Sequence, residues 1–242
     1  MTCHLDAHDK ILSAKLGHPS RATHEVVPSD QRSGNLACAR CHEFGFPSQA
    51  RGAREMMQTT ASEHGRSRFA AQGCGECHMP RVGIDQHRSH ALATTRDPEA
   101  LRRAVKVSAE RNGGKLRVRI VPQGVGHAFP TGDLFRRLNV VVEALDGARV
   151  VRRERRYLAR HFVHRIQPDG ASRREEVADD RPGARTEDAG AVEVDVDFED
   201  AGVGRQIRWQ VAYERVDHLL GDSEDGAAVR EAVVLASGEV RP

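Results

Sequence analysis

Two copies of one five-residue pattern constrain this chain more than any other feature of its sequence. Residues 38–42 read C-A-R-C-H and residues 74–78 read C-G-E-C-H, so both follow C-x-x-C-H. From five Cys and 13 His in 242 residues, about 0.006 such patterns are expected by chance. The repetition therefore reflects a chemical requirement, and the N-terminal part must fold around whatever these side chains hold.

The residue types in each pattern suit a covalently attached haem. Thiols at positions i and i+3 reach the two vinyl groups of one haem and form thioethers, and the next imidazole lies under the iron as its proximal ligand. The sequence therefore predicts two complete haem c sites. Their thioether residues are Cys38, Cys41, Cys74 and Cys77, and their proximal iron ligands are His42 and His78.

A single zinc ion held by four cysteines is the main alternative for the same patterns. The 32 residues between Cys41 and Cys74 exceed the usual spacing of a zinc ribbon. A zinc site also gives no reason for a histidine directly after both cysteine pairs. Thioredoxin-like redox chemistry requires a βαβ context that the sequence lacks. A zinc-stabilised binding module stays as the second alternative function.

The fifth cysteine suggests half of a third site. The chain begins Met1-Thr2-Cys3-His4, so a cysteine before Met1 would complete another C-x-x-C-H. We therefore expect Met1 to be an internal codon of a longer protein, whose signal peptide is lost by truncation. Cys3 would then bind haem and His4 would be its proximal ligand. The alternative is a true start with a lone thiol.

The chain resembles the multihaem c-type cytochromes of bacterial respiratory chains, in particular those in which haem motifs precede a β-rich domain. The resemblance rests on both C-x-x-C-H units, the C-H-M-P string at 77–80, the pair His87 and His90, and the G-H-A-F-P-T-G string at 126–132. It extends to about residue 145, beyond which only the β pattern agrees. It implies haem c and iron as cofactors, redox proteins as electron donor and acceptor, and a periplasmic or cell-surface location.

An iron with two histidine ligands needs a second imidazole opposite the proximal one. We favour His127, His90 and one of three histidines nearer the N-terminus. His127 is favoured because it lies between Gly126 and an F-P-T-G turn, where backbone crowding is low. The full set of candidates for this second position is His18, His24, His64, His87, His90 and His127.

Composition bounds the remaining possibilities. The chain is 38% hydrophobic and 30% charged, as in globular proteins rather than disordered ones. It has no run of 18 apolar residues, so no transmembrane segment is expected. The net charge of +2 gives no overall attraction to nucleic acid.

The pattern changes near residue 97, which predicts an α+β fold by segments. Residues 1–97 indicate a multihaem region of loops and short helices, with 51–71 as the best helical candidate. Residues 98–242 indicate a β-rich, antiparallel sandwich-like domain, with a short helix after Asp97 and a long polar loop at about 168–190. Strands are predicted on both sides of the turn residues at 112–114 and at 146–147. Further strands are predicted at 192–198, 207–213 and 233–240.

These features favour an electron carrier over a substrate-converting enzyme, acting in a respiratory or extracytoplasmic redox chain. The first alternative is a multihaem oxidoreductase acting on a small nitrogen or sulfur compound, which needs an iron with an open position. The histidine supply is large enough to close every iron. The 33 Arg against 4 Lys also suggest pairing with the haem propionates, for which Arg136 and Arg137 are candidates.

Overall fold

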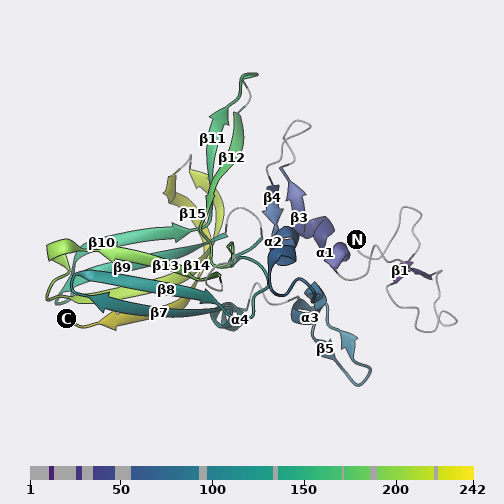
Figure 1. Cartoon of the computed structure of the whole chain (residues 1–242), viewed down its shortest axis with the longest axis horizontal. Coiled ribbons are helices and arrows are strands. Elements are labelled where there is room, and N and C mark those ends of the chain that lie inside the picture. The colour runs from purple at the N-terminus through teal and green to yellow at the C-terminus, as the bar shows by residue number, and fades with distance from the viewer. Residues whose placement is uncertain are drawn as a thin grey trace.

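The computed structural model describes residues 11–13, 26–28, 35–46, 56–92, 97–132, 136–170, 172–185, 190–220 and 223–242. Short helices and two-stranded pairs make up its N-terminal part, at the purple and blue end of the chain in Figure 1. These elements are β1 (Ile11–Ser13), β2 (Val26–Pro28), α1 (Asn35–His42), β3 (Glu43–Gly45), β4 (Met56–Thr59), α2 (Thr60–Arg66), α3 (Cys74–His78), β5 (Arg81–Val82) and β6 (His87–Arg88).

The prediction of a helix over 51–71 is wrong for most of the described residues in this range, which are 56–71. Strand β4 occupies 56–59 and pairs antiparallel with β3, so the helix starts only at Thr60. It stops at Arg66, because Ser67 turns its hydroxyl back to donate to the His64 carbonyl over 2.9 Å. Serine side chains compete with helical backbone hydrogen bonds in this way.

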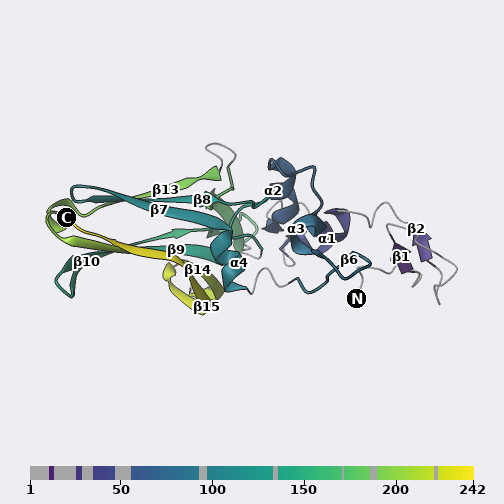
Figure 2. The same cartoon turned by 90° about the horizontal axis from the view of Figure 1, so that it is seen from below.

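Two antiparallel sheets form the C-terminal part and face each other as layers, which Figure 2 shows edge-on. One sheet has the order β13-β8-β7 and the other β10-β9-β14-β15. The expected sandwich-like architecture is therefore confirmed. The elements are α4 (Pro98–Arg103), β7 (Val105–Asn112), β8 (Lys115–Pro122), β9 (Arg136–Asp146), β10 (Arg149–Leu158), β11 (Arg160–Ile166), β12 (Ser172–Asp179), β13 (Val192–Asp197), η5 (Glu199–Ala201), β14 (Gln206–Leu220) and β15 (Ser223–Val240).

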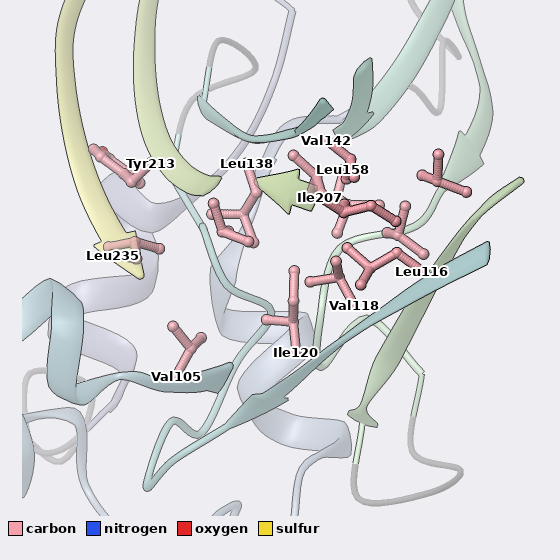
Figure 3. Packing of buried hydrophobic residues seen from close by; sticks show 14 of the residues in the cluster. Val105, Leu116, Val118, Ile120, Leu138, Val142, Leu158, Ile207, Tyr213 and Leu235 are labelled. Carbon is pink, nitrogen blue, oxygen red and sulfur yellow. The ribbon is translucent and has the colours of Figure 1, made fainter. Parts of the chain in front are cut away.

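The core lies between these two sheets and follows from strict alternation. Leu116, Val118 and Ile120 of β8 are fully buried, because every second residue of a strand points to the same face. They pack into one cluster with Leu138 of β9 and Ile207 of β14 (Figure 3). Burying side chains of this size contributes roughly 1.5–3 kcal/mol each.

The predicted helix start and hairpin turns are also confirmed. Asp97 caps α4 by accepting a hydrogen bond of 2.9 Å from the backbone N–H of Glu99. Gly113 and Gly147 lie in the turns before β8 and β10 with φ of 60° and 59°, a conformation that favours glycine. These turns set the register of the two hairpins.

The prediction of a long polar loop at about 168–190 is wrong over residues 172–179, because these residues form strand β12. This strand pairs with β11 in a hairpin that projects from the sandwich (Figure 1). The hairpin lacks clean apolar alternation and carries cross-strand ion pairs instead, such as Arg165 with Glu175 at 2.5 Å. Among the described residues, no helix is long and apolar enough to cross a membrane.

Candidate functional site

The two C-x-x-C-H motifs lie on short helices that the fold holds side by side. Asn35, at the start of α1, accepts a 2.7 Å hydrogen bond from the backbone N–H of Cys74, at the start of α3. Its Oδ1 also lies 3.0 Å from the Cys74 Sγ atom. The beginning of one motif helix therefore fixes the beginning of the other, across 39 positions of sequence.

The motif cysteines remain accessible for chemistry. Cys41 and Cys77 are exposed, Cys38 and Cys74 are half-buried, and the four are not joined to one another by disulfides. Positions i and i+3 of a helix lie on the same face, so each helix presents two thiols in one direction. This is the arrangement that thioether attachment to a single haem requires.

The structure pairs His78, the last residue of α3, with His127 from the segment between β8 and β9. Their ring centroids are 6.1 Å apart and the ring planes are inclined by only 16°. Burial lowers the pKa of His78, and the positive charge of His42 lowers it further. Burial also lowers the pKa of His127. Both rings therefore favour the neutral form that binds metals.

A backbone hydrogen bond fixes which nitrogen of His127 is available. Nδ1 lies 2.9 Å from the carbonyl oxygen of Ala128, and a carbonyl can only accept, so Nδ1 carries the proton. The lone pair of the neutral ring then lies on Nε2. Anchoring one ring nitrogen of a histidine in this way is typical of metal ligands.

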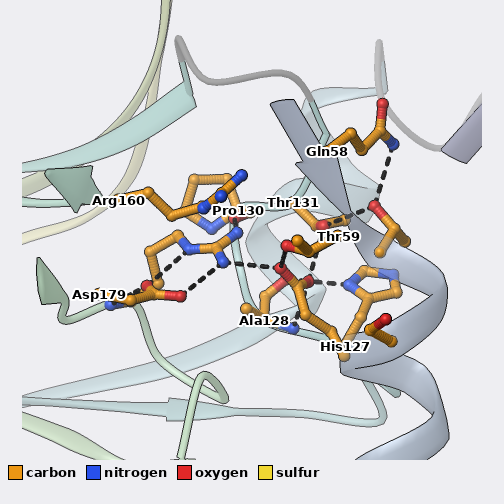
Figure 4. A network of polar contacts seen from close by, with 12 residues as sticks. Gln58, Thr59, His127, Ala128, Pro130, Thr131, Arg160 and Asp179 are labelled. Atoms are coloured by element: carbon orange, nitrogen blue, oxygen red, sulfur yellow. Dashed lines mark hydrogen bonds and ion pairs between the residues drawn. The ribbon is translucent and has the colours of Figure 1, made fainter. Parts of the chain in front are cut away.

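A buried carboxylate holds the segment that carries His127. Glu63 of α2 accepts hydrogen bonds from the backbone N–H of Ala128 at 3.2 Å and from the Thr131 hydroxyl at 2.8 Å. Arg181 donates to the other Glu63 oxygen at 2.7 Å and to the Pro130 carbonyl at 2.8 Å. Figure 4 shows this network around Ala128, Pro130 and Thr131. The network joins α2 to the β-rich part.

The ionisation of this network follows from its contacts. Burial alone would raise the pKa of Glu63, but the Arg181 guanidinium and hydrogen bonds from Arg181, Thr59 and Thr131 outweigh it and hold the pKa below its usual value. Asp179 also pairs with Arg181, at 2.8 Å. Glu63 and Arg181 are therefore both charged, which a buried site tolerates only when such partners are present.

Gly126 is needed for close approach. A Cβ atom at this position would lie 3.1 Å from both the His64 Cδ2 atom and the Phe69 Cβ atom. A side chain at this position would force His64 of α2 and Phe69 to shift by a few tenths of an ångström. The absence of a side chain at Gly126 therefore relieves crowding beside His127, as the sequence predicts.

The other motif histidine, His42, contacts a buried amide. The Nε2 atom of Gln58 lies 2.8 Å from His42 Nδ1, and it donates to the Thr60 hydroxyl over 3.0 Å. Thr60 in turn bonds Thr131 at 2.8 Å. A hydrogen-bonded chain thus runs from His42 to the segment that carries His127.

The remaining predicted ligands lie in different settings. His64 is half-buried beside Gly126, whereas His87 and His90 are exposed. His87 Nδ1 lies 2.8 Å from Asp85 Oδ1, and His90 Nδ1 lies 3.0 Å from the Arg88 carbonyl oxygen. The predicted residues Cys3, His4, His18 and His24 lie outside the described residues.

The pairing of Arg137 with a haem propionate is not supported. Arg137 donates from Nε to the buried carboxylate of Glu214 at 2.7 Å, and Arg136 donates to the Tyr213 hydroxyl at 2.9 Å. Conversely, sequence reasoning missed Gln58, Glu63 and Arg181. The T-x-x-E pattern at 60–63 signals only a helix start, so nothing in the sequence marks Glu63 as a partner of the His127 segment.

No three His, Cys, Asp or Glu side chains converge on one point within the described part of the chain. A bare zinc ion usually requires at least three protein ligands. A haem supplies the ring nitrogens itself and needs only the two axial ligands from the protein. Within the described residues, the pair His78 and His127 thus supplies the two protein ligands that a haem iron requires.

Comparison with known proteins gives one result. No protein-family model and no curated protein matches the sequence. The structure is similar to the crystal structure of a penta-haem cytochrome c552 from Thermochromatium tepidum, with a TM-score of 0.63 and 17% sequence identity. The match covers 99% of this chain and 75% of that chain. Almost the whole of this chain therefore shares its fold with about three quarters of that chain.

Proposed function

We propose that this chain transfers electrons through covalently bound c-type haems, with His78 and His127 as the two axial ligands of one iron. The spacing of the two rings carries the proposal. Metal–imidazole bonds are about 2 Å long, so two imidazoles on opposite sides of one iron have ring centroids roughly 6 Å apart. The rings of His78 and His127 have centroids 6.1 Å apart.

The residues around this pair suit the same role. Cys74 and Cys77 lie on the helix that ends at His78, where they would form the two thioether bonds. Cys38, Cys41 and His42 would hold a second haem on α1, beside α3. When bound, haem supplies reversible one-electron chemistry at its iron, and the protein sets the potential through axial ligands, burial and hydrogen bonds.

The surrounding protein has three tasks in this proposal. Glu63 and Arg181 hold the His127 segment against α2, so that its ring stays within 6.1 Å of the His78 ring, centroid to centroid. The Ala128 carbonyl fixes the tautomer of His127. The sandwich provides a rigid support, because the segment leaves directly from β8 and leads into β9.

The fold similarity supports this proposal and widens it. The similar structure is that of a penta-haem cytochrome, so we propose other redox proteins as electron donor and acceptor. Haem c attachment occurs outside the cytoplasmic membrane in the cytochromes that the chain resembles, so we propose a periplasmic or cell-surface location. The division into a haem-binding part at 1–97 and a β-rich part at 98–242 belongs to the same proposal.

The test is intact-mass spectrometry of the chain expressed behind a signal peptide in a haem-maturing host. We expect at least two covalent haems and sharp low-spin bands in the reduced-minus-oxidised spectrum. The C38A/C41A and C74A/C77A variants should each lose the mass of one haem. A folded, colourless protein with an unmodified mass and stoichiometric zinc would overturn the proposal in favour of a zinc-stabilised module.

A further inference from the structure

A basic groove lies on the β-rich part, outside the haem-binding residues. It has a volume of about 790 Å³ and is bounded by β10, the β11–β12 hairpin and the region where β14 meets β15. Seven arginines and His161 line it, against only three carboxylates. Several of these arginines pair with carboxylates beside the groove, such as Arg137 with Glu214 and Arg160 with Glu176, so the positive charge that reaches solvent lies on the rim.

The groove has a fixed back and an exposed rim. At the back, the Arg137 guanidinium lies 3.7 Å from the centre of the Tyr157 ring and binds Glu214. On the rim, the side chains of Arg153 and Arg156 are each 56% exposed and that of Arg155 is 38% exposed. The rim arginines follow one another along β10, which is the edge strand of its sheet. They therefore present positive charge to solvent from a rigid element.

His161 adds a permanent charge to the floor of the groove. Its Nε2 atom lies 3.0 Å from Asp180 and its Nδ1 atom lies 2.7 Å from Glu224. Both nitrogens are thus held by carboxylates, which stabilise the protonated ring. His161 and its two partners therefore keep the same charge across the physiological pH range, and the positive face of the groove is that of the rim arginines.

One wall of the groove is shared with the first haem motif. Arg160 donates to the backbone carbonyls of Met56 and Met57, at 2.7 and 3.1 Å. The next residue, Gln58, contacts His42. On the same wall, the rings of Phe162 and Phe46 meet edge to face with centroids 6.1 Å apart. A molecule seated in the groove therefore lies against the strand pair that supports His42.

We propose that this groove docks a carboxylate-rich face of a one-electron redox protein and brings it next to the haem site at His42. The inference rests on the proposed function, to which it adds the docking face and the charge of the partner. Interfaces for electron transfer are small and polar, and complementary charge raises their association rates. One electron would pass from the partner to the chain or back, and no atom or proton changes place.

The first test measures binding without electron transfer. The holoprotein is titrated with an oxidised plant-type [2Fe–2S] ferredoxin, an acidic one-electron carrier, in a calorimeter at low and high salt. The variant R155E/R156E reverses two rim charges. The control K106E/R149E changes the net charge equally, at exposed positions outside the groove lining. We expect salt-sensitive binding, weakened about tenfold or more by R155E/R156E and less than about threefold by the control.

Equal weakening of ferredoxin binding by both variants would overturn the docking proposal, because it would show a response to net charge alone.

The second test separates failure of the docking proposal from failure of the proposed function. Reduction by the cationic reductant methyl viologen radical is followed by stopped-flow absorbance. If R155E/R156E is slowed with ferredoxin but not with methyl viologen, the groove proposal is supported. If methyl viologen reduces the wild type but R155E/R156E and the control behave alike with ferredoxin, only the groove proposal fails. A wild type that contains no reducible haem contradicts the proposed function itself.

Discussion

Glu63 and Arg181 form an ion pair in which each side chain is only 4% exposed, and it joins α2 to the β-rich part across 118 positions of sequence. Removing one partner leaves an uncompensated buried charge, which costs about 3–5 kcal/mol. We expect Arg181→Met to lower the free energy of unfolding by that amount in denaturant titrations. We expect Glu63→Leu/Arg181→Met to recover part of the loss, because the buried Glu63 charge is then removed as well. Asp179 also loses its partner Arg181 in this variant, but its side chain is 24% exposed and reaches solvent.

The matched control for this cycle is Arg165→Met. Arg165 pairs with Glu175, but their side chains are 57% and 43% exposed, so its loss should cost less than about 1 kcal/mol. If Arg181→Met costs no more than Arg165→Met, the buried pair does not hold the two parts together.

The proposed ligation by His127 predicts that His127→Ala opens one iron. With this imidazole removed, the haem proposed at His78 would lack its second protein ligand, so the reduced variant should bind carbon monoxide at one more haem per chain than the wild type. The measurement is the carbon monoxide difference spectrum of the reduced protein. The control is His164→Ala, an exposed histidine on β11. An unchanged spectrum for His127→Ala would refute the assignment of His127 as an axial ligand.

Gly126→Ala should disturb the same iron without removing a ligand. The added methyl group would lie 3.1 Å from His64 and Phe69, and overpacking of this kind costs about 1–3 kcal/mol. We expect a lower unfolding free energy and a partly high-spin spectrum, because the segment moves away from α2. Gly65→Ala is the control, since its Cβ meets nothing within 4 Å and alanine favours helices by about 0.5–1 kcal/mol. Equal behaviour of the two variants would contradict the close approach at Gly126.

Sequence alone predicts the covalent chemistry of the site but not its support. C-x-x-C-H places both thiols and the proximal histidine within five residues, so local spacing suffices. Glu63 and Arg181 have no such local signal, because their pairing exists only once α2 and the turn after β12 meet. The same reasoning applies to β12, whose cross-strand ion pairs stabilise a hairpin that hydrophobic periodicity does not reveal. The strands of the sandwich are predictable because apolar and polar residues alternate along them, as at Leu116, Val118 and Ile120 of β8.

Gln58→Leu should raise the reduction potential of the haem that we propose at His42. A ring that binds iron through Nε2 carries its proton on Nδ1, which lies 2.8 Å from the Gln58 amide nitrogen. Rotation of the amide by 180° about its terminal bond exchanges this nitrogen for the oxygen, which then accepts from Nδ1. Such an acceptor increases the basicity of the ligand, which stabilises the oxidised iron. Gln58→Glu should therefore shift the potential in the opposite direction. Potentiometric titration measures both variants, and shifts of the same sign would contradict the role of the hydrogen bond.

The raised pKa of His161 predicts that the protein loses stability in alkaline solution. The hydrogen bonds that His161 donates to Asp180 and Glu224 raise its pKa from 6.5 to about 10. The folded-state pKa lies above the unfolded value, so the stabilisation is complete below about pH 6.5 and is lost as the pH rises to 10. Hydrogen bonds to a charged group are worth about 1.5–3 kcal/mol, so the unfolding free energy should fall by about that amount between pH 6 and pH 10. His161→Gln should flatten this fall, whereas His164→Gln should keep it. If wild type and His161→Gln lose stability in parallel, His161 is not protonated in the folded protein.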